Sequence, residues 1–305
     1  LLSHESVLGS NLGPRSPGSI LTLLYKQAIN ENIFNLKKIE VTDYINQLED
    51  CCKKNTVEII KSSQVKKIVT KNNSVTGIQL NNNEVIESKC VMSNADPKTT
   101  YLNLLGAEIL DTDFIRRIKN FRNKGNVAKL ELVLENEINI KNIDKKMYGK
   151  FIYAPNIKYI EHAFNANKYN HYSKNPCLEF YVNDNTLSAN IYYVPYLINA
   201  SHQENEIIEK CVAVLNKFIP DMKIRQQKLI TPNQMEEKYN ISGGHWHHGD
   251  LEIDQLLMMR PFYGSSQYST PVNGLYLCSA GTHPGGGLTG INGLNAAKKI
   301  IEDSK

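Results

Sequence analysis

The spacing of hydrophobic residues and the helix-starting residues divide the chain into helical and extended stretches. Helices are expected over residues 16–28, 42–52, 98–122, 206–219, 231–239 and 291–301. The second of these helices has an apolar face that is expected to pack inward, formed by Tyr44, Ile45, Leu48 and Cys52. Thr289 precedes the last helix and is expected to cap it.

Extended stretches lie between the helices. Strands are expected at 57–59, 65–68, 75–80, 127–134, 178–182, 191–194 and 275–278. Asparagines at 72–73 and 81–83 are turn signals, so the region from 65 to 80 predicts a small antiparallel meander. A further buried strand is expected from Cys90, and a polar loop ends it before Pro97.

The composition is that of an ordinary soluble globular protein. Of the 305 residues, 41% are hydrophobic and 22% are charged, and the net charge of +4 comes from 35 basic and 31 acidic residues. Lys and Arg are scattered, so no nucleic-acid partner is expected. No apolar run approaches the roughly 20 residues of a membrane span, and the first residues show no signal peptide. Peripheral membrane contact and a homo-oligomer stay open.

The six cysteines argue against disulfide or metal chemistry. They stand at 51, 52, 90, 177, 211 and 278 and form no C-x-x-C pair. A reducing compartment such as the cytoplasm is therefore expected, and neither a disulfide framework nor a zinc site is. Cys278 lies inside a predicted strand, which argues against a nucleophilic role.

A glycine-rich stretch near the C-terminus is the strongest candidate site. Residues 281–290 hold five glycines and one proline between a predicted strand and a predicted helix. Such a turn brings bare backbone N–H groups and the positive helix end toward an anionic ligand. The alternative is a glycine-rich turn that binds nothing, and the G-x-G-x-x-G spacing of a first dinucleotide loop is absent here.

Two other features carry alternative interpretations. Residues 243–249 contain His245, His247 and His248, but adjacent histidines without partners at set spacings argue against metal, so packing near a cofactor is expected. The sixteen tyrosines concentrate in 148–196, either as ordinary sheet packing or as the lining for a large apolar substrate. With no nucleophile motif present, a cofactor is expected to supply the chemistry.

The order of several C-terminal motifs resembles a known family. Thr231-Pro232, the 243–249 stretch, Arg260-Pro261, the Tyr268–Pro271 segment and the 281–290 turn occur in the order seen in phytoene dehydrogenase-like FAD-dependent oxidoreductases. The branch most similar is the pyridine nucleotide-disulfide oxidoreductase domain-containing protein 2 group. Weaker matches at Val65, Gly77–Leu80 and Ser93–Pro97 extend the resemblance over nearly the whole chain.

The resemblance implies an α/β fold, α+β overall, in which a discontinuous Rossmann-like FAD-binding domain carries an inserted substrate domain of mixed sheet and helices. It implies these segments: 1–56, mainly substrate-domain helices; 57–97, FAD-domain meander and strand; 98–261, substrate domain; 262–305, C-terminal FAD-binding segment. Val65 would contact the adenine side of FAD through its backbone. The rest of FAD would lie along Gly281, Gly285, Gly286, Gly287, Leu288, Thr289 and Gly290.

The implied activity is hydride transfer between FAD and an apolar, lipid-like substrate, with flavin-dependent isomerisation as a close variant. No catalytic residue is assigned, and His283 is the first candidate. Members of the family open with a strand and G-x-G-x-x-G, which this chain lacks, so it resembles the C-terminal portion of such an enzyme. The alternative is a non-catalytic binding or regulatory module without the FAD pyrophosphate loop.

Overall fold

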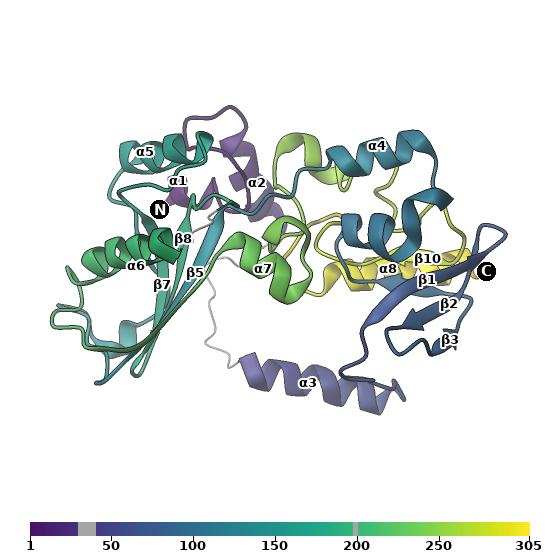
Figure 1. The fold of residues 1–305 in the computed structure, drawn as a ribbon, viewed down its shortest axis with the longest axis horizontal. Coiled ribbons are helices and arrows are strands. Elements are labelled where there is room, and N and C mark those ends of the chain that lie inside the picture. The colour runs from purple at the N-terminus through teal and green to yellow at the C-terminus, as the bar shows by residue number, and fades with distance from the viewer. Residues whose placement is uncertain (30–40, 198–200) are drawn as a thin grey trace.

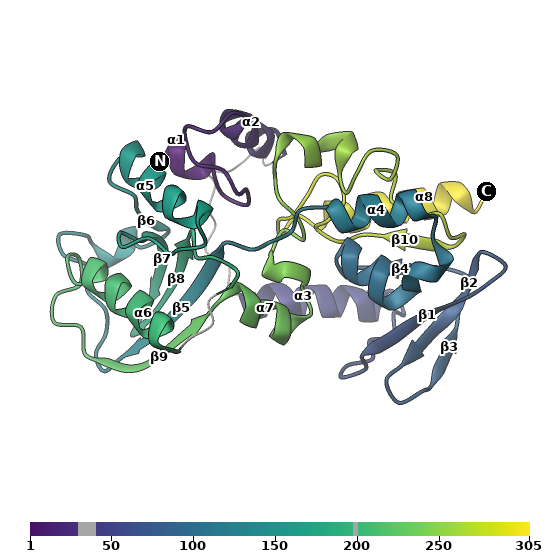
Figure 2. The same cartoon turned by 45° about the horizontal axis from the view of Figure 1, so that its top comes forward.

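The computed structural model describes residues 1–29, 41–197 and 201–305. Figure 1 shows two parts side by side: a large sheet with its helices, and two small sheets with the C-terminal helix. Strands from the first and last thirds of the chain pair in the second part. The helices near the N-terminus lie where the two parts meet (Figure 2).

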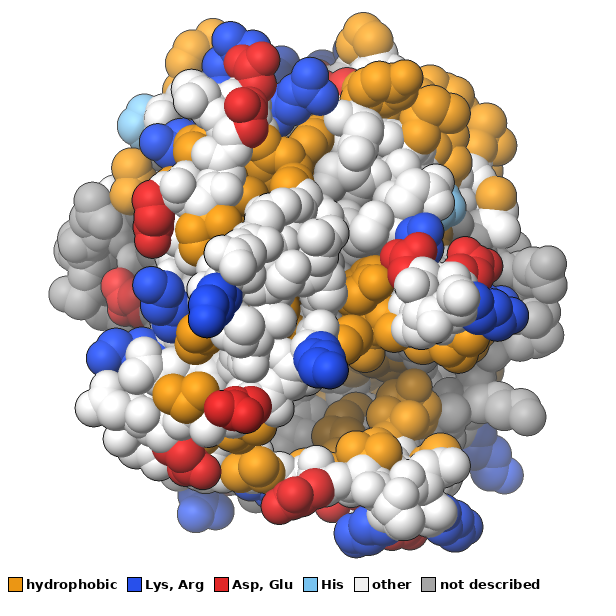
Figure 3. Space-filling model, turned by 90° about the vertical axis from the view of Figure 1, so that its right-hand side faces the viewer, with side chains coloured by type: hydrophobic (Ala, Val, Ile, Leu, Met, Phe, Trp, Pro, Cys, Tyr) orange, Lys and Arg blue, Asp and Glu red, His pale blue; other side chains and the backbone are white. Residues whose placement is uncertain are grey.

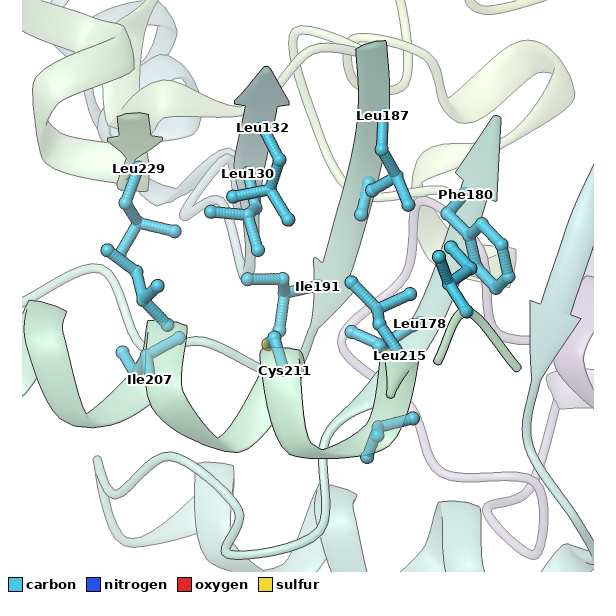
Figure 4. Close-up of a cluster of buried hydrophobic side chains, with 14 of the residues drawn as sticks. Leu130, Leu132, Leu178, Phe180, Leu187, Ile191, Ile207, Cys211, Leu215 and Leu229 are labelled. Atoms are coloured by element: carbon cyan, nitrogen blue, oxygen red, sulfur yellow. The ribbon is translucent and has the colours of Figure 1, made fainter. Parts of the chain in front are cut away.

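A five-stranded antiparallel sheet organises the first part. Its strands follow the order β6 (Phe151–Tyr153), β7 (Cys177–Asn183), β8 (Thr186–Tyr192), β5 (Val127–Leu134) and β9 (Ile224–Ile230). Helix α6 (Ser201–Leu215) covers one face through Ile207, Cys211 and Leu215 (Figure 4). Since successive residues of a strand point to opposite faces, the other face is left for α5 (Ile157–Lys168), which packs there through Ile160 and Phe164.

Two small sheets organise the second part. Strands β1 (Val65–Lys71), β2 (Ser74–Leu80) and β3 (Val85–Glu87) form the expected antiparallel meander. Strand β4 (Val91–Ser93) pairs in parallel with β10 (Leu275–Leu277), and α8 (Ile291–Asp303) follows β10. Parallel and antiparallel pairing thus occur in different sheets of one α/β protein. The division of the chain into an FAD domain and a substrate domain stays a prediction.

The remaining helices connect and flank these sheets. They are α1 (Leu2–Glu5), α2 (Ser19–Ile29), α3 (Val41–Lys54), η1 (Thr99–Gly106), η2 (Ala107–Ile109), α4 (Thr112–Asn120), η3 (Lys145–Met147), α7 (Pro232–Tyr239), η4 (Ser242–Gly244), η5 (Ile253–Gln255) and η6 (Leu257–Met259). The helix expected over 98–122 is broken into three, because Gly106 adopts a φ of 94° and Asp111 caps a new helix.

Three local predictions are wrong. Val57 and Ile59 are 51% and 42% exposed and lie outside any described strand. Two apolar residues do not form a strand unless another segment pairs with them. Gly290, not Thr289, is the N-cap of α8, and Thr289 Oγ1 accepts only a long 3.4 Å bond from Ile291.

The third wrong prediction concerns α3, which was expected to pack its apolar face inward. It has no buried residue, and Ile45 and Leu48 are 49% and 50% exposed. Helical spacing shows which residues share a face, but it does not supply a surface to cover that face. The face is only partly covered: Tyr44 is half-buried and donates from Oη to the Leu288 carbonyl of the glycine turn at 3.1 Å, while Figure 1 shows α3 lying apart from the two sheets.

The surface of the second part is mixed in charge. On the face shown in Figure 3, Lys and Arg side chains are interspersed with acidic and hydrophobic ones and form no continuous basic patch. Across the three described ranges, no helix combines the length and the hydropathy that crossing a membrane requires.

Candidate functional site

The glycine-rich turn between β10 and α8 is held from the first turn of that helix. The side-chain amide of Asn292 donates to the carbonyls of Ser279, Thr282 and His283, at 3.1, 3.0 and 3.3 Å. Tyr268 Oη donates to the same His283 carbonyl at 2.7 Å. The backbone at the start of the turn, from Ser279 to His283, is therefore fixed by the protein alone, as a pre-organised binding site requires.

Arg260 ties this turn to the histidine stretch. Its guanidinium is completely buried and donates to the backbone carbonyls of Ala280, His247, Gly249, Asp250 and Gln255. Burial lowers the pKa of Arg260 to about 10, so the group remains charged at neutral pH. Backbone dipoles thus compensate a buried charge and fix two loops relative to each other.

The histidine stretch packs beneath the turn. His245 is buried, and its Nε2 lies 3.4 Å from Asp250 Oδ1. Burial lowers the pKa of His245 to about 3 and lowers that of His247 well below its ordinary value, so both rings are neutral at pH 7. Within the described ranges, no group of three or more His, Cys, Asp or Glu side chains is placed to hold a metal ion.

Two glycines of the turn are required by packing within the protein. A Cβ on Gly281 would lie 2.3 Å from Cδ of Pro97. A Cβ on Gly286 would lie 2.6 Å from Nδ1 of His247. Real Cβ atoms do not approach so closely, so these positions exclude side chains whether or not a cofactor is bound.

Three other glycines of the turn are required by backbone conformation. Gly285, Gly287 and Gly290 have φ angles of 103°, 142° and 67°, which disfavour other residues. A Cβ on Gly287 would come no closer than 3.9 Å to another side chain, and one on Gly290 would meet nothing within 4 Å. Leu288 between them is 84% exposed. This end of the turn is therefore open.

Val65 lies in a cavity of about 780 Å³ beside the turn, formed by residues that include Ser93, Asn94, Asp96 and His248. That volume is within the range of ligand sites, about 300–1,000 Å³. The turn itself does not line the cavity. The two are nevertheless adjacent, because the Cys278 amide donates to the Ser93 carbonyl at 2.9 Å and Gly281 packs on Pro97.

His283 is the one histidine of the turn. Its Nδ1 lies 3.1 Å from Oη of Tyr25, which comes from α2 near the start of the chain. Partial burial, and secondarily the charge of Arg260, lower the pKa of His283. The ring is therefore neutral at pH 7.

The tyrosines of 148–196 pack within the first part of the molecule. Tyr192 and Tyr193 are 5% and 2% exposed, and Tyr153 contacts the core between the sheet and α6. None of the tyrosines in this range is among the residues that line the 780 Å³ cavity. Sheet packing accounts for the buried members of this set, whereas Tyr169 and Tyr181 are 75% and 45% exposed.

The sequence alone indicated no role for three residues of the site, and Arg260 was named only as part of the Arg260-Pro261 motif. Arg260 could have been suspected, since it is a lone charge after the apolar run from Leu256 to Met259. Asn292 gives no local signal beyond its place at a helix start. Tyr25 gives none, because its contact with His283 spans 258 positions of sequence.

Comparisons with known proteins bear on the fold and the class. No family model matches the chain. Rat pyridine nucleotide-disulfide oxidoreductase domain-containing protein 2 is 26% identical over 336 residues, which cover 100% of this chain and 58% of the rat protein. Phytoene desaturase (lycopene-forming) of Pantoea ananas is 22% identical over 267 residues, covering 81% of this chain and 52% of that protein.

Among solved structures, an oxidoreductase from Methanosarcina mazei superimposes with a TM-score of 0.54 at 13% identity, covering 100% of this chain and 64% of that one. The chain therefore shares the fold of that oxidoreductase, in agreement with the predicted α/β class. Its similarity to the rat domain-containing protein 2 extends over its whole length, and its similarity to the phytoene desaturase over most of it. The chain spans little more than half the length of these curated relatives.

The residues present fit the flavin end of FAD. The open positions at Gly287 and Gly290 leave room for a planar group against the backbone. The N-cap of α8, Gly290, has no side chain to cap the helix, and only the Ile291 N–H makes a long 3.4 Å bond, to Thr289 Oγ1. The next N–H groups and the positive dipole end can therefore face an electronegative atom.

Proposed function

We propose that the chain forms the flavin side of an FAD-dependent oxidoreductase that exchanges a hydride with an apolar, lipid-like substrate. The observation that carries this proposal is the open end of the turn at Gly287–Gly290, in front of an N-terminus of α8 that has no side-chain cap from Gly290. The relation to a phytoene desaturase supports the choice of an apolar substrate.

The chain's own residues supply positioning and electrostatics. FAD, when bound, accepts or donates the hydride. Asn292 and Tyr268 hold the backbone of the turn, and Arg260 keeps the turn against the histidine stretch. The N-terminus of α8 would stabilise negative charge near it, and so would favour an anionic form of a reduced flavin held there. The neutral, buried histidines beneath the turn contribute packing without adding charge.

A titration of the purified chain with FAD tests this proposal. Binding is followed by the quenching of flavin fluorescence and of the fluorescence of Trp246, the only tryptophan, which lies in the histidine stretch. Gly290→Ala should weaken FAD binding at least about tenfold, which corresponds to about 1.4 kcal/mol, because its methyl group enters the open space of the turn.

Gly264→Ala is a matched control. Gly264 also has a positive φ, 88°, and open space around its missing side chain, but it lies outside the turn. Gly264→Ala therefore has the same cost, about 1–2 kcal/mol, of placing alanine at a positive φ, but it leaves the candidate site unchanged. Gly286 is unsuitable for the test, since a side chain there would strike His247 with or without FAD.

If the folded chain shows no FAD binding, the proposal fails for this chain and a non-catalytic binding module becomes the better interpretation. Equal loss of FAD binding in Gly290→Ala and Gly264→Ala would place the cofactor elsewhere.

A further inference from the structure

The contact between α2 and the glycine turn determines which nitrogen of His283 carries its proton. Tyr25 Oη lies 3.1 Å from His283 Nδ1 and 2.8 Å from the carbonyl oxygen of Pro284. Both partners belong to the turn, whereas Tyr25 belongs to a helix from the opposite end of the chain (Figure 2). A single phenol therefore bridges the side chain of one turn residue and the backbone of the next.

A count of protons settles the direction of each bond. Burial raises the pKa of Tyr25 to about 12, so at neutral pH the phenol keeps one proton. The Pro284 carbonyl can only accept, and the phenol proton must therefore point toward it. The phenol oxygen also accepts from the Leu257 backbone and has a second lone pair. Since no phenol proton is left for Nδ1 of His283, that nitrogen has to be the donor to the second lone pair. In a neutral imidazole that leaves Nε2 with a lone pair.

Nε2 is accessible. Within the described ranges no hydrogen bond reaches it, and it is not among the buried polar atoms that lack a partner. The backbone of His283 is held separately, since Tyr268 and Asn292 bind its carbonyl oxygen. Ring and backbone are thus fixed from two sides, and only Nε2 is left free.

We propose that Tyr25 is a positioning residue that holds His283 in the Nδ1–H tautomer and so presents the Nε2 lone pair as the proton acceptor of this site. The chemical consequence rests on the proposed function. In a desaturation, FAD would supply the acceptor for the hydride and its bonding electron pair, and Nε2 of His283 would take the proton from the neighbouring carbon as the carbon–carbon double bond forms. His283 then becomes an imidazolium with protons on both nitrogens.

The tautomer can be measured directly in the chain by long-range ¹H–¹⁵N correlation spectra of the ¹⁵N-labelled protein, at a pH where His283 is neutral. The spectra separate an N–H nitrogen from a lone-pair nitrogen of the same ring. His283→Gln identifies the His283 signals by their loss. The wild-type chain should show the proton on Nδ1. Tyr25→Phe, which removes one hydroxyl, should lose most of this population in favour of the Nε2–H form.

Tyr268→Phe is the matched control, because Tyr268 binds the backbone of His283 and not its ring. It should leave the tautomer unchanged. A proton on Nε2 in the wild type would overturn the inference, and so would a tautomer that Tyr25→Phe does not alter. The measurement needs no flavin. A confirmed tautomer with no FAD binding would therefore reject the proposed function alone, whereas FAD binding with the wrong tautomer would reject only this inference.

Discussion

Replacing Arg260 by lysine should destabilise the fold by several kcal/mol. The guanidinium makes six hydrogen bonds to five backbone carbonyls and is fully buried. A lysine ammonium has three donors, so at least two of the five carbonyls lose their bond to residue 260. The Asp250 carbonyl keeps a second donor, the Gln255 side-chain amide at 3.4 Å, so one or two buried acceptors are left unpaired. Each costs about 1–3 kcal/mol, which gives a loss of roughly 1–6 kcal/mol. That is a large share of a typical stability of about 5–15 kcal/mol.

Arg116 supplies the control for this prediction. Its guanidinium lies 3.1 Å from Asp113, and the two side chains are 69% and 68% exposed. Exposed ion pairs contribute about 0–1 kcal/mol, so Arg116→Lys should have little effect. Urea unfolding of both variants, followed by Trp246 fluorescence and by circular dichroism, gives the two free energies. A loss below about 1 kcal/mol for Arg260→Lys, or one equal to that of Arg116→Lys, would refute the reasoning from unpaired carbonyls.

Two further predictions concern stability. Burial lowers the pKa of His4 from 6.5 to about 4, so protonation opposes folding and stability is lost as the pH falls through that window. Urea unfolding at pH 7 and pH 5 measures how much stability the protein loses between the two pH values. His4→Phe should lose roughly 2 kcal/mol less than the wild type. An equal loss in both proteins would show that His4 is not its source. Leu130→Ala, at a fully buried position of β5, should cost about 2–5 kcal/mol, whereas Leu48→Ala on the exposed face of α3 should stay within about 0.5 kcal/mol. Equal losses in the same assay would mean that the face of α3 is covered.

The predictions that the structure confirms rest on residues close together in the sequence. Helix α7 begins at the predicted Thr231, whose backbone amide is 3.0 Å from the Gln234 side chain in a capping box. The meander follows its asparagine turns, and the order of β10, glycine turn and α8 was evident from apolar runs around a cluster of glycines. These features depend on residues within a few positions of one another, so propensity and spacing determine them.

Only the tertiary structure determined the contacts between distant segments of the chain. The sequence marked 281–290 as one glycine-rich turn, but only packing shows that Gly281 and Gly286 face protein while Gly287 and Gly290 face open space. It named His283 as a candidate without indicating that Tyr25 would orient the ring. It predicted a packed inner face for α3, whereas no residue of α3 is buried in the structure. Spacing along a chain determines which side chains share a face, and the surface that meets that face depends on how the whole chain folds.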